Sequence, residues 1–143
     1  MKRVERSALV GYSAEQMYDL VNDIEQYPSY MPGCSGAEIL ERGDTWIEAR
    51  LDLSKAGLKQ SFVTRNELIA PSEINLSLKE GPFKALKGQW RFEVLSDTAC
   101  KISFWLAFEF SNRLVGLAAD KLFEKVASEQ VAAVTARAKQ LYS

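Results

Sequence analysis

The amino-acid sequence predicts an α+β fold in which a curved antiparallel β-sheet wraps around one long C-terminal α-helix, with two short helices after the first strand. Two observations lead to this prediction. Alternating apolar and polar residues recur from Ala37 to Phe110 with only short turns between the runs, which is typical of an antiparallel meander. The apolar period then becomes helical from Asn112 to Tyr142, and only this segment is long enough to cover the apolar face of such a sheet. The length of 143 residues fits a single domain over 1–143.

The N-terminal part predicts one strand and two helices. The strand is expected over Val4–Val10. Ser13 and Gln16 have the spacing of a capping box, in which an N-cap serine is followed three residues later by glutamine. Apolar residues at helical spacing behind this box predict a helix over about 14–22, and a second short helix is expected over 24–30.

Six consecutive strands are expected after these helices. The first begins near Ala37, and the apolar segments of the others lie at 47–53, 62–69, 74–78, 90–94 and 102–110. Ser54–Gly57 is a predicted hairpin loop. The last strand is the clearest, because its apolar residues occupy every second position without exception.

The C-terminal segment predicts a single uninterrupted helix. Its apolar stripe consists of Phe123, Ala127, Val131, Val134, Ala138 and Leu141. No proline or glycine follows Gly116, so we expect one helix of about 28 residues, roughly 40 Å long. Its many small side chains leave two interpretations open, a cavity between helix and sheet or an ordinary packed core.

The composition restricts the chemistry that the chain can perform. It contains no histidine, which excludes histidine-based triads, histidine general acid–base catalysis and histidine metal ligands. Cys34 and Cys100 form no CxxC pair, and no phosphate-binding glycine loop is found. We therefore expect a protein that is not an enzyme and requires no metal or cofactor, although a cyclase that uses Asp, Glu, Tyr or Lys stays open.

Charge and hydropathy restrict partners and location. The net charge of −1 argues against a general nucleic-acid binder, so no DNA partner is expected. No apolar segment follows Met1–Arg6, and a secretory signal is therefore not expected. The expected location is the cytoplasm, with membrane contact limited to the periphery.

Several segments along the whole chain carry a family resemblance. They are Asn22–Cys34, Ser54–Gly57, Gly81–Phe83, Trp90–Phe92, Phe108–Asn112 and Arg137–Ser143. In this order they resemble the coenzyme Q-binding START-domain family. The resemblance implies a helix-grip fold (START-like, Bet v1-like) with an apolar tunnel between the sheet and the long helix. One departure is Val134, where the family pattern implies phenylalanine; the smaller side chain would widen the tunnel.

The resemblance also implies three functions. Relatives bind ubiquinone and support its use in respiration, which predicts non-catalytic binding of ubiquinone or a similar isoprenoid lipid. The bacterial branch includes toxins of toxin–antitoxin pairs that block the joining of ribosomal subunits, which predicts the large ribosomal subunit as a partner. Older descriptions as oligoketide or polyketide cyclases and lipid transporters leave a cyclase or aromatase as the third and least favoured interpretation.

Apolar and aromatic side chains form the predicted ligand-binding set. Its members are Tyr27, Tyr30, Phe83, Trp90, Phe92, Phe104, Phe108, Phe123, Val131 and Val134. Ligand pockets are mostly apolar, but aromatic residues on the inward face of a sheet also pack simply against one another. The Tyr27–Pro32 segment is either a mobile lid or a rigid corner, and Gly81–Phe83 is either a ligand-facing loop or a turn.

Two charged groups are candidate contacts as well. The first is a basic cluster that would meet ribosomal RNA or anionic lipid headgroups, or would form a solvated edge: Lys79, Lys84, Lys87 and Arg91. The second lies opposite the apolar strand face: Glu48, Arg50, Arg65 and Glu67. Cross-strand ion pairs on the solvent side explain it, and an inward charge that meets a quinone carbonyl is the alternative.

Overall fold

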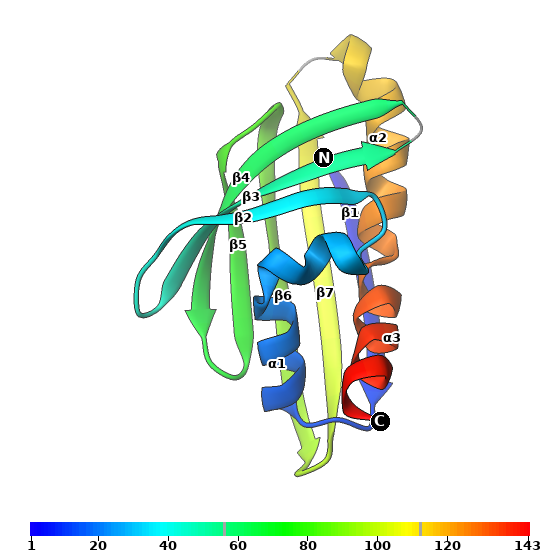
Figure 1. Cartoon of the computed structure of the whole chain (residues 1–143). Helices are drawn as coiled ribbons and strands as arrows, with labels where there is room; N and C mark the ends of the chain where they lie inside the picture. Colours follow the sequence, from blue (N-terminus) through cyan, green and yellow to red (C-terminus); the bar gives the residue numbers. More distant parts are fainter. Residues whose placement is uncertain (56, 112) are drawn as a thin grey trace.

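Seven antiparallel strands form one curved sheet in the computed structural model of this protein, which describes residues 1–55, 57–111 and 113–143 (Figure 1). The strands are β1 (Lys2–Val10), β2 (Cys34–Arg42), β3 (Trp46–Lys55), β4 (Leu58–Ile69), β5 (Glu73–Glu80), β6 (Phe83–Ser96) and β7 (Ala99–Phe110). Their order across the sheet is β1-β7-β6-β5-β4-β3-β2. Strands β2 to β7 therefore form the predicted antiparallel meander, and β1 pairs with β7 at one edge.

A capped helix and a 3₁₀ helix follow β1. Helix α1 spans Ala14–Asn22, as predicted. Ser13 Oγ accepts a hydrogen bond from the backbone N–H of Gln16 at 3.1 Å, and Gln16 Oε1 accepts one from the backbone N–H of Ser13 at 3.0 Å. The predicted capping box is therefore present. The second short helix is the 3₁₀ helix η1 (Ile24–Ser29), one residue shorter than predicted.

The C-terminal segment forms the predicted long helical element, but it is broken at Glu129 into two helices, so the expectation that it is uninterrupted is wrong. Helix α2 spans Arg113–Ser128 and α3 spans Gln130–Tyr142, while the predicted start at Asn112 lies outside the described residues. At the junction, the backbone N–H of Glu129 and the side-chain amide of Gln130 both donate to the Val126 carbonyl, at 3.2 and 3.0 Å. Side-chain competition for backbone carbonyls bends helices without proline or glycine.

The loop between β3 and β4 is shorter than predicted. Ser54 and Lys55 are paired residues of β3, and Ala56 lies outside the described residues. Gly57 has a φ of 81°, in the left-handed region that glycine adopts without strain. The last pair of β3 and β4 on this side is Lys55 with Leu58.

Two groups of helices cover the concave face of the sheet. Helices α2 and α3 lie end to end along β1 and β7, while α1 lies over β6 and β7, and η1 lies beside β2 (Figure 1). The prediction that the C-terminal helix alone covers the sheet is wrong, because α1 buries an apolar face of its own through Met17, Leu20 and Val21. None of the described helices is both long and apolar enough to cross a membrane.

Candidate ligand-binding cavity

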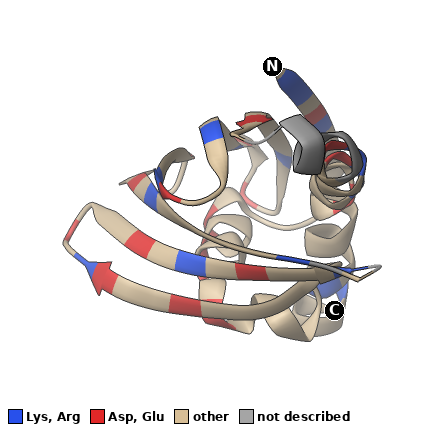
Figure 2. Ribbon diagram, turned by 90° about the horizontal axis from the view of Figure 1, so that it is seen from above, with Lys and Arg blue, Asp and Glu red and all other residues tan. Residues whose placement is uncertain are grey.

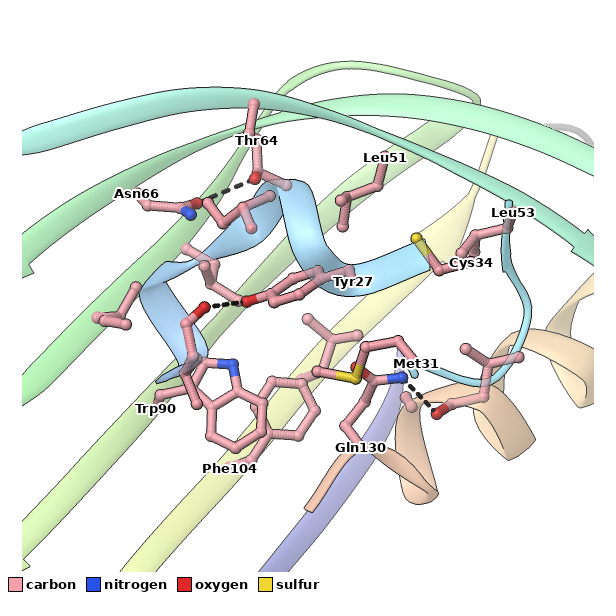
Figure 3. Close-up of a pocket in the computed structure, with 18 of the residues that line it drawn as sticks. Tyr27, Met31, Cys34, Leu51, Leu53, Thr64, Asn66, Trp90, Phe104 and Gln130 are labelled. Atoms are coloured by element: carbon pink, nitrogen blue, oxygen red, sulfur yellow. Dashed lines mark hydrogen bonds between the residues drawn. The ribbon is translucent and has the colours of Figure 1, made fainter. Parts of the chain in front are cut away.

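A cavity of about 100 Å³ lies between the concave face of the sheet, η1 and α2 (Figure 3). The sheet contributes Ala49, Leu51, Leu53, Phe62, Thr64, Asn66, Ile74, Leu76, Leu86, Trp90, Phe104 and Leu106. The cover contributes Val21, Asn22, Ile24, Tyr27, Met31, Pro32, Phe123, Val126, Ala127 and Gln130, together with Cys34 at the start of β2. An engineered cavity of about 150 Å³ binds benzene, so this space approaches the size of one ring.

The sequence of the inner strand faces explains why space remains at this place. Between the sheet and helices α1 and α2, the space is filled by large core side chains, among them the fully buried Phe108 and Ile102. On β3 and β4 the inner positions include the smaller Ala49 and Thr64, which are paired across the two strands. Both residues line the cavity, and Ala49 also belongs to a buried cluster with Ile24 of η1, so the space lies beside this contact.

Four residues of the predicted ligand-binding set line the cavity: Tyr27, Trp90, Phe104 and Phe123. Trp90 and Phe104 form its floor, with ring centroids 4.4 Å apart (Figure 3). Tyr27 forms part of its roof, and its hydroxyl donates to the Val21 carbonyl. Burial raises the pKa of Tyr27 well above its ordinary value, so this hydroxyl stays neutral and holds η1 against α1.

The other six residues of that set do not line the cavity. Phe92 and Phe108 are buried in the core, and Val134 is fully buried on α3. Val131 lines a more open groove between β1 and α3. Tyr30 packs edge-to-face on Tyr27, with ring centroids 6.1 Å apart. Contact between these residues and a ligand remains a prediction.

Phe83, the sixth residue, belongs to an aromatic cluster at the end of the sheet. Its ring stacks on Phe110 at 4.5 Å and lies 5.2 Å from Phe123. Gly81 before it has a φ of 150°, and a Cβ there would lie 2.6 Å from Phe62 Cβ. This geometry supports the interpretation of Gly81–Phe83 as a turn that packs against the core.

The Tyr27–Pro32 segment is held by contacts to α1 and α3. Besides the Tyr27 bond to α1, the guanidinium of Arg137 lies 5.3 Å from the centre of the Tyr30 ring. Burial raises the pKa of Tyr30, against the opposing influence of Arg137. Met31 is buried behind them. In this structure the segment roofs the cavity, and its role as a mobile lid or a rigid corner remains a prediction.

Two polar residues of the cavity wall escaped the sequence analysis. Thr64 and Asn66 are buried on the inner face of β4, each with 5% of its surface exposed. Thr64 Oγ1 donates to Asn66 Oδ1 at 2.9 Å (Figure 3). The signal that would have found them is the alternation of β4, in which Phe62 and Leu68 flank the pair at inward positions.

The second charged group forms ion pairs on the outer face, as its solvent-side interpretation predicts. Glu48 accepts from Arg65 at 3.2 Å and from Lys79, and Arg65 also bonds Glu67 at 2.7 Å. Arg50 lies 2.7 Å from Glu38 on β2. The hydrogen bond from Lys79, together with the nearby Arg65, holds the pKa of Glu48 below its ordinary value. Residues of both signs alternate along the strands in Figure 2.

The predicted basic cluster is divided among separate surroundings. Lys79 is paired with Glu48, and Lys84 lies 4.0 Å from Glu109. Lys87 is exposed on β6. Arg91 lines a shallow polar hollow with Arg3, Arg6, Lys101, Glu5 and Glu93. This mixture of basic and acidic side chains is what the interpretation as a solvated edge predicts. Contact with a ribosome or a headgroup remains a prediction.

Comparison with known proteins shows similarities that cover most or all of this chain. Residues 10–135 match the family described as polyketide cyclase/dehydrase and lipid transport. The chain is 49% identical over 143 residues to "Ribosome association toxin RatA" from Escherichia coli K12, covering 100% of this chain and 90% of that protein. It is 30% identical over 148 residues to "Coenzyme Q-binding protein COQ10 homolog B, mitochondrial" from Xenopus laevis, covering 99% of this chain and 60% of that protein.

Solved structures share the fold. The Zhui aromatase/cyclase from Streptomyces sp. R1128 superposes with a TM-score of 0.85 at 19% identity, covering 97% of this chain and 94% of that chain. At this identity the likeness concerns the fold alone. The expectation of a helix-grip, START-like fold is confirmed.

Proposed function

Because this chain belongs to the polyketide cyclase/dehydrase and lipid transport family, and resembles its RatA and coenzyme Q-binding members along its whole length, we propose that it binds ubiquinone or a similar isoprenoid lipid in the cavity. In this proposal the protein holds the ligand without transforming it and thereby supports the respiratory use of quinones.

The observation that carries the proposal is the cavity itself. Cores are normally packed without voids, and unfilled volume destabilises a protein by about 24 cal/mol per Å³. For a cavity of about 100 Å³ this corresponds to roughly 2 kcal/mol. An apolar group that enters the space recovers such packing energy, and most of the wall is apolar.

The cavity volume limits how a long lipid would lie. The space of about 100 Å³ approaches the size of one ring, so an isoprenoid tail has to leave the cavity. We expect it to leave between Met31 and Gln130, which both line the cavity, because there the segment after η1 lies close to the junction of α2 and α3 (Figure 3). This route requires side-chain movement at that border.

The absence of catalysis is part of the proposal and is supported by the character of the wall. None of the residues found to line the cavity is Asp, Glu, Lys or Arg, and the chain has no histidine. General acid–base chemistry needs a titratable group within reach of the substrate. A cyclase that used this cavity would have only Tyr27 and Cys34 of the wall as titratable groups. Burial raises the pKa of both residues.

The test is extraction of protein purified under native conditions, followed by mass spectrometry of the organic phase. We expect a near-stoichiometric quinone or lipid from the wild type. Ala49→Leu, which extends a side chain into the cavity, should carry none, and Ala136→Leu, the same change at an exposed site of α3, should carry as much as the wild type. A clean wild-type extract with no binding of added ubiquinone would overturn the proposal.

A second candidate function is favoured by the 49% identity to a protein named as a ribosome association toxin. We propose that the outer surface binds the large ribosomal subunit and blocks subunit association. Overexpression should then deplete 70S particles in sucrose gradients. Lys79 is already paired with Glu48. The variant that tests the basic residues as ribosome contacts without breaking this pair therefore replaces only Lys84, Lys87 and Arg91 with glutamine. Undiminished 70S particles with the wild type would contradict this candidate, and Ala49→Leu should remain active if surface and cavity act separately.

A further inference from the structure

We propose that Asn66, positioned by Thr64, donates a hydrogen bond to a carbonyl oxygen on the head group of the bound ligand. The cavity would thus select uncharged apolar molecules that carry a carbonyl over hydrocarbons of the same shape. This inference rests on the proposed function, in which the cavity binds an apolar ligand.

The pair lies in surroundings that are otherwise apolar. Across the sheet, Thr64 is paired with Ala49 and Leu78, and Asn66 with Ile47 and Leu76. Asn66 comes from β4, and its side chain points into the space above Trp90 (Figure 3). Valine and leucine would fit this face, so the two polar side chains are a departure that packing does not require.

The hydrogen bonding of the pair leaves two donors unused. The Thr64 hydroxyl donates to Asn66 Oδ1, so the carbonyl half of the amide is occupied. The Asn66 Nδ2 group carries two N–H donors, and it forms no hydrogen bond to any residue that the structure describes. Among the described residues, the fully enclosed side-chain atoms without a partner are Asn22 Oδ1, Tyr30 Oη and Arg137 Nε, so Asn66 Nδ2 is not sealed in the core. Because Asn66 lines the cavity, a ligand oxygen in that space could accept its N–H groups.

The other polar groups of the wall are less suited to this task. Gln130 Nε2 donates to the Val126 carbonyl at 3.0 Å, and the Tyr27 hydroxyl donates to the Val21 carbonyl. The Cys34 thiol donates to the Gly36 carbonyl at 3.3 Å. Asn22 is the one competing donor of the wall: its Oδ1 is buried without a partner and can only accept, but its amide nitrogen carries two N–H donors as well, so the variant Asn22→Leu has to be compared with Asn66→Leu.

The charge of the wall defines the ligand class further. No cationic side chain lines the described cavity, so a carboxylate or phosphate would be buried without compensation, which is strongly unfavourable. An uncharged ketone, ester or other ring-bound carbonyl matches both the donor and the volume. The inference therefore concerns the oxygen of the head group and not the tail.

A matched pair of probes tests the proposal: hexanophenone and hexylbenzene, which differ only by a carbonyl in place of a methylene. Binding to the full chain is measured by calorimetric titration. We expect the wild type to prefer hexanophenone by about five- to tenfold, the range of one neutral hydrogen bond. Asn66→Leu should lose this preference and still bind hexylbenzene, while Asn22→Leu should keep it.

The outcomes separate this inference from the proposed function. If the wild type binds neither probe, the cavity proposal itself fails. If it binds both equally, or if Asn66→Leu keeps the preference, only the role of Asn66 is overturned. Should Asn66→Leu fail to fold, the side-chain amide resonances of Asn66 in the wild type decide: they should shift with hexanophenone and stay in place with hexylbenzene, and equal shifts would overturn the inference.

Discussion

At the scale of single residues, the two cysteines have different surroundings. Cys34 is half-buried in the cavity wall, whereas Cys100 is fully buried on β7. Burial raises the pKa of both thiols, so both are mostly protonated at neutral pH and react slowly with electrophiles. Only Cys34 adjoins the proposed ligand, which makes it a reporter of occupancy.

We predict that a cavity ligand protects Cys34 from iodoacetamide. With hexanophenone at ten times its dissociation constant, the alkylation rate should fall roughly tenfold, because only the free protein reacts. Mass spectrometry of the modified protein gives the rate, and Cys34→Ser should show that Cys100 stays unmodified on the same time scale. An unchanged rate in the presence of saturating ligand would show that the ligand lies elsewhere.

The lowered pKa of Glu48 predicts that the stability of the protein depends on pH. The pKa of this residue in the folded protein lies below the ordinary value of 4.5 because Lys79 and Arg65 hydrogen-bond to the carboxylate. A lowered pKa stabilises the folded state at neutral pH, and this stabilisation is lost as the pH falls through the folded pKa. Glu48→Gln should therefore be less stable than the wild type in urea at pH 7, and the difference should shrink as the pH falls below 4.5 and vanish below the lowered folded pKa.

The control for Glu48 is Glu67→Gln. Glu67 also contacts Arg65, but its side chain is 53% exposed, and exposed pairs contribute little. Its unfolding midpoint should stay close to that of the wild type at both pH values. Equal losses at pH 7 and at acid pH for Glu48→Gln would mean that packing, and not charge, is responsible.

At the scale of elements, α1 connects the first strand to the roof of the cavity. Its N-terminus is fixed by the reciprocal bonds between Ser13 and Gln16, and its C-terminal residues Val21 and Asn22 line the cavity. We predict that Ser13→Ala lowers the free energy of unfolding by about 1 kcal/mol, measured by urea denaturation. Ser13→Asp keeps a capping oxygen and should retain most of the stability; a loss as large as that of the alanine variant would show that the cap is not the cause.

The elements that the sequence predicted well are those whose signal is local. Alternation along β7 and the capping box before α1 depend only on neighbouring residues, and both predictions are confirmed. The break between α2 and α3 was missed because it arises from the side chains of Ser128 and Gln130, which bond to the carbonyls of Lys125 and Val126. Such competition leaves no periodicity to detect.

At the scale of the whole molecule, the cavity depends on which strands each helix covers. Tyr27, Trp90, Phe104 and Phe123 were predicted as ligand contacts from their aromatic character together with the family resemblance. They meet because η1 crosses in front of β6 and β7 (Figure 1). The same argument included Phe92 and Phe108, which fill the core under α1 and α2. The two sets differ in whether a helix packs directly on the side chain. This depends on the tertiary structure, and the alternation of residues along a strand does not reveal it.

This arrangement predicts a coupling between ligand binding and global stability. A ligand that binds only the folded state, at one hundred times its dissociation constant, raises the free energy of unfolding by about 2.7 kcal/mol. For a domain of this size, the unfolding midpoint should rise by roughly 10 °C. Ala49→Leu fills the cavity and should show no such rise, while Ala136→Leu should respond as the wild type does. Differential scanning calorimetry with added ubiquinone measures all three proteins. A rise of equal size in Ala49→Leu would place the ligand outside the cavity, because the leucine side chain would block the cavity and the ligand would have to bind at another site.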